Sequence, residues 1–254
     1  MDDPVIRVRG LATRFGDHVV HEGLDLDVGR GEILGVIGGS GTGKSVLLRQ
    51  IVGLLEPAEG EIEVLGQPVR DTSPEEFRDL RRRWGVMFQG GALFSSLSVR
   101  ENVEAPMREQ MDLPDDLRRK LAAIKVRMVG LPDDAMDKPP SALSGGMRKR
   151  AGFARAIALD PEIVFLDEPT AGLDPIGAAA LDVLVRQLRD ALGLTVFLVT
   201  HDLDTLHAIC DRVAVLAERR VLATGTLDEL RDLRHEWLQA YLGGPRGRAA
   251  RGEP

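Results

Sequence analysis

The sequence predicts an α/β fold with a mainly parallel sheet that helices cover on both faces. In the first half, the apolar segment at residues 32–37 runs into a glycine-rich loop, which is followed by apolar residues at helical spacing from Val46 through Leu54 and Leu55. In the second half, strand-like segments at 163–166, 195–200 and 213–216 alternate with helix-like ones at 176–192 and 202–210. Alternation of this kind is typical of parallel sheets with crossover helices.

Two further segments complete the expected organisation. Short alternating segments at 6–8, 18–20 and 24–28, separated by turn residues, predict an antiparallel N-terminal sheet. Residues 93–159 are charged and helical in pattern, with prolines as breaks, and predict an inserted helical subdomain. We therefore expect one domain over residues 1–235, with that subdomain inside it, and a C-terminal tail over 236–254, irregular after Tyr241.

Composition excludes several classes of protein. The chain has 254 residues and a formal net charge of −7, which argues against non-specific nucleic-acid binding. Its single cysteine, Cys210, favours a reducing compartment, and its five histidines show no metal-ligand spacing. No apolar run approaches the roughly 20 residues needed to span a bilayer, and no signal peptide is evident. We expect any membrane role to depend on another chain.

Residues 38–45 match the phosphate-loop pattern G-x-x-x-x-G-K-[ST] in full. The glycines let backbone N–H groups turn toward phosphate oxygens, and the following helix presents its positive N-terminal end. The pattern places Lys44 on the β- and γ-phosphates and the Ser45 hydroxyl on Mg²⁺. The predicted nucleotide-binding residues of this segment are Gly38, Gly39, Ser40, Gly41, Thr42, Gly43, Lys44, Ser45 and Val46. The loop alone does not distinguish among the families that carry it.

An acidic pair follows the apolar strand at residues 163–166. Asp167 at the strand end suits the Mg²⁺ shell opposite Ser45, and Glu168 suits polarisation of the attacking water. A strand that simply ends in polar residues at the surface is the plainer interpretation. The phosphate loop in the same chain favours the catalytic one.

A third segment, Leu143 followed by Ser144, Gly145, Gly146 and Met147, resembles the signature of ATP-binding cassette (ABC) proteins. Ser144 can cap a helix whose N–H groups two glycines leave accessible, which makes a second anion site. The resemblance implies a head-to-tail homodimer, in which each signature closes on the ATP held by the other subunit. It further implies a RecA-like phosphate-loop core with an N-terminal antiparallel β-subdomain and an inserted α-helical subdomain.

The remaining ABC motifs occur in order. Phe15 sits where the family stacks an aromatic ring on adenine, although core packing is the plainer interpretation of a single Phe. Gln89 resembles the Q-loop glutamine that touches Mg²⁺ or the water. Asp174 resembles the D-loop aspartate that acts across the dimer, and His201 the switch histidine at the γ-phosphate. The resemblance thus implies an ATPase with Glu168, His201, Lys44 and Gln89 as catalytic residues, Mg²⁺ on Ser45, Gln89 and Asp167, and ATP as substrate.

Finer similarity points to one group of ABC proteins. Residues 89–103, the signature with Met147 where most of the superfamily has Gln, and the ending at 241–248 are similar to the ATPases of Mla/Mce-type phospholipid transport systems. Met147 cannot donate a hydrogen bond to nucleotide, but the serine and glycines of the anion site are intact. The resemblance implies a pair of permease subunits, an MCE-domain lipid-binding protein, a small STAS-domain protein bound with help from the tail, and a place on the cytoplasmic face of the inner membrane.

Alternatives stay open at this point. The same motor could serve another substrate, such as polar amino acids, because no residue of this chain need contact the cargo. An ABC ATPase of nucleic acid or ribosomes usually has coiled-coil insertions or two cassettes, which this chain lacks. A phosphate-loop kinase leaves the signature, Asp174 and His201 unexplained. Leu93, Phe94 and Leu97 are either the groove that receives a permease helix or ordinary subdomain core.

Overall fold

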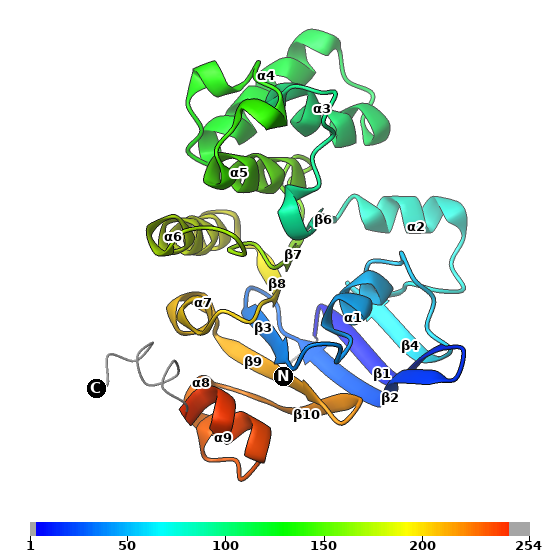
Figure 1. Cartoon of the computed structure of the whole chain (residues 1–254). Helices are drawn as coiled ribbons and strands as arrows, with labels where there is room; N and C mark the ends of the chain where they lie inside the picture. Colours follow the sequence, from blue (N-terminus) through cyan, green and yellow to red (C-terminus); the bar gives the residue numbers. More distant parts are fainter. Residues whose placement is uncertain (1–3, 244–254) are drawn as a thin grey trace. The chain divides into compact units, whose positions relative to one another are not determined.

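The computed structural model describes residues 4–243, and these form two compact units (Figure 1). The first unit joins Met1–Phe77 to Thr195–Pro254, and the second is Arg78–Leu194. Both units contain parallel strands and helices, as the α/β prediction requires.

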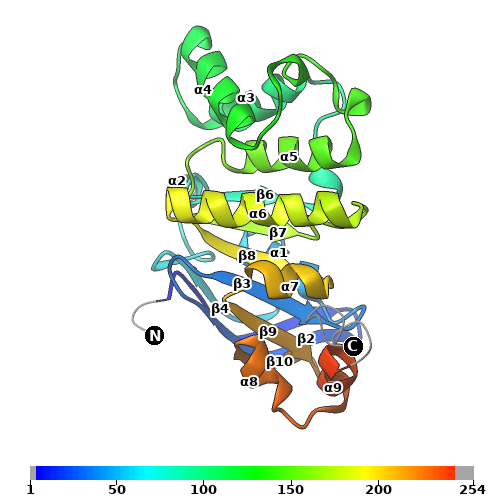
Figure 2. The same ribbon diagram turned by 90° about the vertical axis from the view of Figure 1, so that its left-hand side faces the viewer.

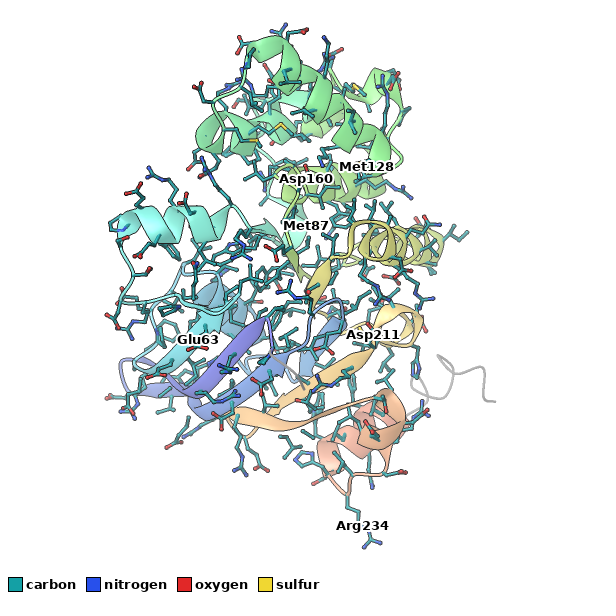
Figure 3. The ribbon with its side chains drawn as sticks, turned by 180° about the vertical axis from the view of Figure 1, so that it is seen from behind. Glu63, Met87, Met128, Asp160, Asp211 and Arg234 are labelled. Carbon is teal, nitrogen blue, oxygen red and sulfur yellow. The ribbon has the colours of Figure 1, made fainter. Side chains whose placement is uncertain are left out.

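An antiparallel sheet in the first unit has the strand order β2-β1-β4-β5. Its strands are β1 (Ile6–Phe15), β2 (His18–Val28), β4 (Glu59–Val64) and β5 (Gln67–Pro68). Ile6 pairs with Val28 on one side and Val64 on the other, and Arg7 forms an ion pair with Glu63 at 2.9 Å (Figure 3). The segments expected at 18–20 and 24–28 form one strand, because bulges absorb the intervening residues without ending the pairing.

A parallel group of strands carries the phosphate loop. Strand β3 (Ile33–Gly38) pairs in parallel with β8 (Thr195–Val199) and β9 (Arg212–Ala217), and β10 (Arg220–Gly225) runs antiparallel to β9. All six residues of β3 are buried, as continuous apolar runs in parallel sheets should be. Asp211 accepts a hydrogen bond from the Ile33 N–H at 2.8 Å and so fixes the start of this strand (Figure 3).

Helices α1 (Lys44–Ile51) and α7 (Leu203–Ile209) lie on opposite sides of these strands (Figure 1). Helix α1 contacts β3, β8 and also β4 of the antiparallel sheet. It ends before Leu54, which sequence pattern had placed on the helix and which is 59% exposed. The reason is Gly53, whose left-handed φ of 71° turns the chain out of the helix.

The second unit is mostly helical. Strands β6 (Trp84–Met87) and β7 (Ile163–Asp167) pair in parallel, and α6 (Pro175–Leu192) follows β7. Helix α5 (Gly145–Ala156) contacts α3 (Val99–Gln110) and α4 (Asp115–Met128), and it also contacts β6 and α6 (Figure 2). Short 3₁₀ turns at Gln89–Gly91, Asp133–Ala135 and Pro140–Ala142 connect these elements.

Local capping agrees with the sequence in several places. Helix α2 (Pro74–Arg81) starts with a capping box, because Ser73 N–H donates to Glu76 at 2.9 Å and Glu76 N–H donates to the Ser73 hydroxyl at 3.2 Å. A second capping box joins Ser98 and Glu101 at the start of α3. These contacts define where helices begin before any tertiary packing is considered.

The C-terminal helices α8 (Leu227–Arg231) and α9 (Glu236–Gly243) belong to the first unit, where α8 contacts both α9 and β10. Leu238 and Leu242 of α9 are buried in a cluster that begins with Ile37, the residue before Gly38. The cluster consists of Ile37, Leu206, Val213, Val215, Leu230, Leu238 and Leu242. Residues 236–243 of the expected tail are therefore helical and packed, and the rest of the tail lies outside the described residues.

Replacing Leu238 with Ala should lower the free energy of unfolding by about 2–5 kcal/mol, because the side chain is 1% exposed and its loss leaves a cavity. Urea unfolding followed by circular dichroism measures this. Leu233→Ala is the matched control: Leu233 is 38% exposed, and we expect a change of about 0.5 kcal/mol or less. Equal effects of the two substitutions would contradict the packing of α9.

Candidate functional site

The phosphate loop connects β3 to α1 and turns sharply at two glycines. Gly41 and Gly43 have φ values of 78° and 92°, which residues other than glycine rarely adopt. The Lys44 ammonium donates to the carbonyl oxygens of Gly38 and Gly39, each at 2.9 Å, and the Thr42 hydroxyl donates to Gly39 at 3.0 Å. The loop is therefore curled around the lysine side chain, and α1 presents its N-terminus at the same place.

A buried polar cluster lies against this loop, and sequence analysis did not identify it. His21 of β2 is fully buried, and its Nδ1 lies 2.9 Å from the Thr13 hydroxyl, which in turn donates to Gln50 Oε1 of α1 at 3.0 Å. A Cβ on Gly43 would stand 2.3 Å from His21 Nε2. Glycine is thus required at position 43 both by the close approach of His21 and by the positive φ. The antiparallel sheet packs directly against the phosphate loop.

Burial of His21 keeps its imidazole neutral. Desolvation lowers the pKa of His21 from 6.5 to about 4, although the backbone of Thr42 and Gly43 partly opposes the shift. Because His21 contacts the loop backbone, its protonation would place a charge inside the packing of the loop. A histidine among alternating strand residues gives no sign of this in sequence, because the contact crosses from β2 to the loop.

Two other predicted site residues belong to the first unit. Phe15 ends β1 and is 49% exposed, so core packing does not explain it. His201 follows β8, and its side chain is exposed. Thr200 beside it is buried, donates its N–H to the Val36 carbonyl at 3.3 Å, and accepts a hydrogen bond from the Asp202 N–H at 3.0 Å.

The acidic pair lies in the second unit, at the end of β7. Asp167 is 5% exposed, whereas Glu168 follows with a left-handed φ of 52°. That conformation is strained for a residue with a Cβ, so the surrounding structure must hold it. Lys149 of α5, which is 5% exposed, donates its ammonium to the Glu168 carbonyl at 2.9 Å.

Lys149 is another residue that sequence analysis did not single out. Burial lowers the pKa of its ammonium, and the nearby carboxylates of Glu168 and Asp167 act in the opposite direction. The lysine therefore balances negative charge at the acidic pair and fixes the turn that directs Glu168. Helical spacing after the signature could have suggested it, because Lys149 lies on the buried side of α5.

The signature and the predicted D-loop are adjacent within the second unit. The Ser144 hydroxyl accepts the Met147 N–H at 3.2 Å and caps α5, as predicted. A Cβ on Gly145 would stand 3.7 Å from Leu173, the residue before Asp174. Asp174 itself caps α6 by accepting the Gly177 N–H at 2.9 Å, a local role that sequence analysis did not include.

Gln89 follows β6 at the start of a 3₁₀ turn and is exposed. The chain then passes close to α5, where a Cβ on Gly152 would stand 3.0 Å from the Gly91 Cα. Gly90 and Gly91 have φ values of 79° and 82°, so this turn depends on glycine. The tight turn holds Gln89 at the end of its strand.

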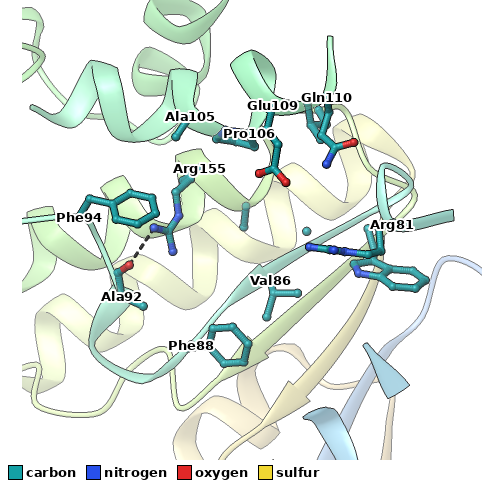
Figure 4. A pocket seen from close by; sticks show the side chains of 14 residues that line it. Arg81, Val86, Phe88, Ala92, Phe94, Ala105, Pro106, Glu109, Gln110 and Arg155 are labelled. Carbon is teal, nitrogen blue, oxygen red and sulfur yellow. Dashed lines mark hydrogen bonds between the residues drawn. The ribbon is translucent and has the colours of Figure 1, made fainter. Parts of the chain in front are cut away.

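A groove, here called the α3–α5 groove, lies beside this turn in the second unit (Figure 4). Its lining includes Arg81, Phe88, Phe94, Pro106, Glu109 and Arg155. The Arg155 guanidinium stands 5.7 Å from the Phe94 ring centre and donates to the Ala92 carbonyl at 2.8 Å. Phe94 is 54% exposed, and Leu93 and Leu97 are not among the lining residues.

The predicted site residues thus divide between the units. The first unit holds the phosphate loop, Phe15 and His201. The second holds Gln89, the signature, the acidic pair and Asp174. Most of them stand at the carboxyl end of a parallel strand or at a helix N-terminus, where loops in α/β folds carry functional groups.

Comparison with protein families decides the relationship. The family model described as ABC transporter matches residues 21–171, which include the phosphate loop, Gln89, the signature and the acidic pair. This chain belongs to the ABC transporter family. It is accordingly an ATPase coupled to transport, of a kind that dimerises and works with a membrane permease.

Curated relatives of this ABC protein cover nearly its whole length. It is 41% identical to the intermembrane phospholipid transport system ATP-binding protein MlaF of Haemophilus influenzae, over 96% of this chain and 94% of that protein. It is 36% identical to MlaF of Escherichia coli K12, over 94% of this chain and 89% of that protein. It is also 36% identical to the "Probable ribonucleotide transport ATP-binding protein mkl" of Mycobacterium tuberculosis H37Rv, over 95% of this chain and 67% of that protein.

Solved structures confirm the cassette fold. The dimeric structure of MJ0796, a bacterial ABC transporter cassette, gives a TM-score of 0.80 at 29% identity and covers 87% of this chain and 98% of that one. CbiO1 of Clostridium perfringens, part of the transporter complex cbiONQ, gives 0.81 at 33% identity and covers 98% and 100%. Within residues 4–243, no helix combines the length and apolar character that a bilayer crossing needs.

The buried histidine of this ABC cassette predicts a specific loss of stability in acid. His21 binds a proton more readily unfolded, with a pKa of 6.5, than folded, with a pKa of about 4. Its stabilising contribution, on the order of 3 kcal/mol, is therefore complete above pH 6.5 and is lost as the pH falls toward 4. Urea unfolding between pH 7 and pH 4.5 should show His21→Gln losing this part of the pH dependence.

His18→Gln is the matched control, because His18 is exposed on the same strand. It should keep the wild-type pH dependence of unfolding. If His21→Gln follows the same pH profile as His18→Gln, then the buried imidazole does not set acid stability.

Proposed function

We propose that this chain is the ATP-hydrolysing motor of a transporter that moves phospholipid between membranes through an MCE-associated permease. The observation that carries the proposal is its 41% identity to MlaF of Haemophilus influenzae over 96% of its own length. The full set of cassette motifs supports a working ATPase. An ATP-binding subunit with a degenerate site would be expected to have lost at least one of these groups.

Each predicted residue has a role in this proposal. Phe15 stacks on adenine, and residues 38–46 hold the phosphates. The oxygen donors of Ser45, Gln89 and Asp167 suit Mg²⁺, which prefers hydroxyl, amide and carboxylate oxygens. Magnesium bound by such donors would neutralise charge on the β- and γ-phosphates.

The chemical step follows from the acidic pair. Glu168 orients a water and accepts its proton, while the water oxygen bonds to the γ-phosphorus and the bond to the β–γ bridging oxygen breaks. Lys44 and His201 stabilise the charge that develops on the transferred group. In a homodimer, Ser144, Gly145, Gly146 and Met147 of one subunit would close on the γ-phosphate held by the other, with Asp174 at that interface.

Glu168→Gln should lower kcat about 10²- to 10⁴-fold with ATP binding retained, because the amide cannot accept the proton. Phosphate release at saturating ATP measures the rate, and size exclusion with MgATP measures trapped dimer. Glu75→Gln, at an exposed position of α2, is the matched control and should hydrolyse normally. Normal hydrolysis by Glu168→Gln would sink the general-base assignment.

The α3–α5 groove is the proposed docking site for a cytoplasmic helix of the permease. Phe88, Phe94 and Pro106 offer apolar surface, and Glu109 and Arg155 provide polar groups within the groove. Since Gln89 directly follows Phe88, a helix seated here would be linked to the residue proposed for Mg²⁺ and the water. Closure of the dimer would then reach the permease through this turn.

Pull-down of tagged Glu168→Gln protein from native membranes in mild detergent tests the cargo. Mass spectrometry should find a multi-span permease, an MCE-domain protein and bound phospholipid, and also a small STAS-domain protein. The same pull-down with Phe94→Ser added should lose the permease, because the groove loses its exposed ring. Leu117→Ser on α4, where Leu117 is 43% exposed, is the control and should keep it.

Recovery of a different permease without an MCE protein would keep the motor and discard the lipid assignment. The similarity to mkl makes a ribonucleotide transporter the specific alternative. In that case nucleotides, not phospholipid, would accompany the complex, and the groove would still bind the permease.

A further inference from the structure

The C-terminal helix α9 contacts two loops of the candidate nucleotide site within the first unit. The Tyr241 hydroxyl donates to the His201 carbonyl at 2.9 Å. The indole Nε1 of Trp237 lies 3.7 Å from where a Cβ on Gly39 would stand. Leu238 and Leu242 anchor α9 in the core cluster, and the rings of Trp237 and Tyr241 pack against that same cluster.

Residues on both sides of His201 are held by hydrogen bonds. Thr200 connects it to β3 through the Val36 carbonyl, and Asp202 begins α7 by accepting the Asp204 N–H at 3.0 Å. His201 lies between these two points with its side chain exposed. The bond from Tyr241 holds the backbone of His201 itself, from an element about 40 residues further along the chain.

The aromatic rings of Trp237 and Tyr241 pack against each other. Their rings stack with centroids 4.8 Å apart and planes inclined by 12°, as residues four apart on a helix can. The stack limits rotation of the Tyr241 ring and so directs its hydroxyl. Gly39, beside Trp237, is the residue whose carbonyl accepts hydrogen bonds from Lys44 and Thr42.

We propose that Tyr241 is a positioning residue for ATP hydrolysis. It holds the backbone of His201 in place, while Trp237 of the same helix contacts the phosphate loop. Tyr241 does not touch the reacting atoms; it acts through the backbone of His201. The inference rests on the proposed role of His201 at the γ-phosphate. It assigns a function in the catalytic cycle to the C-terminal helix, which lies outside the segment that the family model matches.

Tyr241→Phe removes the hydroxyl and keeps the stacked ring, so the fold should be preserved. Single-turnover and steady-state hydrolysis should show kcat about fivefold lower with KM for ATP unchanged, as expected for one neutral hydrogen bond lost from the hydrolysis step. The melting temperature should match wild type. Gln239→Ala, at an exposed position of α9, is the control and should leave kcat unchanged.

A double-mutant cycle with His201→Ala separates this inference from the role of His201. If Tyr241 acts through His201, Tyr241→Phe should have no further effect on the residual rate of His201→Ala. An unchanged kcat in Tyr241→Phe, or an equal fivefold loss in both backgrounds, overturns the inference alone. Normal hydrolysis by His201→Ala overturns the role of His201 and the inference with it.

The contact of Trp237 has a spectroscopic test. The chain has two tryptophans, so Trp84→Phe leaves Trp237 as the only indole. MgATP should change the emission of Trp237, whereas Mg²⁺ alone should not. An emission that is indifferent to MgATP, in protein shown to bind it, overturns the part of the inference that concerns Trp237.

Discussion

The close approach of Gly43 to His21 is the contact around which the first unit is arranged. A Cβ at Gly43 would stand 2.3 Å from the His21 ring and 2.5 Å from Val20. The phosphate loop can therefore approach the antiparallel sheet only because residue 43 is glycine. Gln50 of α1 joins the same polar cluster through Thr13. The loop is thus held by β3 before it, by α1 after it, and by the sheet beside it. A loop supported in this way keeps its N–H groups oriented, so that the loop need not rearrange when phosphate binds. Electrostatic stabilisation of phosphate requires such preorganised donors.

In the second unit, one lysine has a comparable role. The buried ammonium of Lys149 binds the carbonyl of Glu168, which is the residue with the strained backbone at the end of β7. The lysine comes from α5, the helix that begins at the signature, so a hydrogen bond joins the acidic turn to that helix. A shift of α5 would therefore alter both the proposed anion site at Ser144 and the direction of Glu168.

The C-terminal helix α9 likewise supports loops of the candidate site. Its leucines belong to the core cluster that includes Ile37 of β3, and its aromatic pair lies beside Gly39 of the phosphate loop and the backbone of His201, two segments proposed to act on phosphate. Helix α9 lies outside the residues that the family model matches, yet it packs in the same core cluster as Ile37, which lies inside them. In the proposed role of Tyr241, α9 affects hydrolysis without containing a catalytic group.

The sequence by itself determined the fold class, the family and the positions of the motifs. Contiguous patterns such as residues 38–45 and 144–147 have their chemistry encoded locally, because a loop or a helix cap is made by neighbours in the chain. The capping box at Ser73 and the helix cap at Ser144 are recognisable in sequence for the same reason. Apolar runs and their spacing likewise indicated which segments are strands and which are helices.

Only the tertiary structure decided the parts that depend on distant segments. His21 looks like any strand residue until β2 meets the phosphate loop, Lys149 like part of a basic run until α5 meets β7, and Tyr241 like the start of an irregular tail until α9 meets His201. The bulges that make residues 18–28 one strand, and the exposure of Leu54 beyond α1, depend on pairing and on a single left-handed glycine. Such contacts join residues far apart in sequence, and side-chain periodicity carries no information about them.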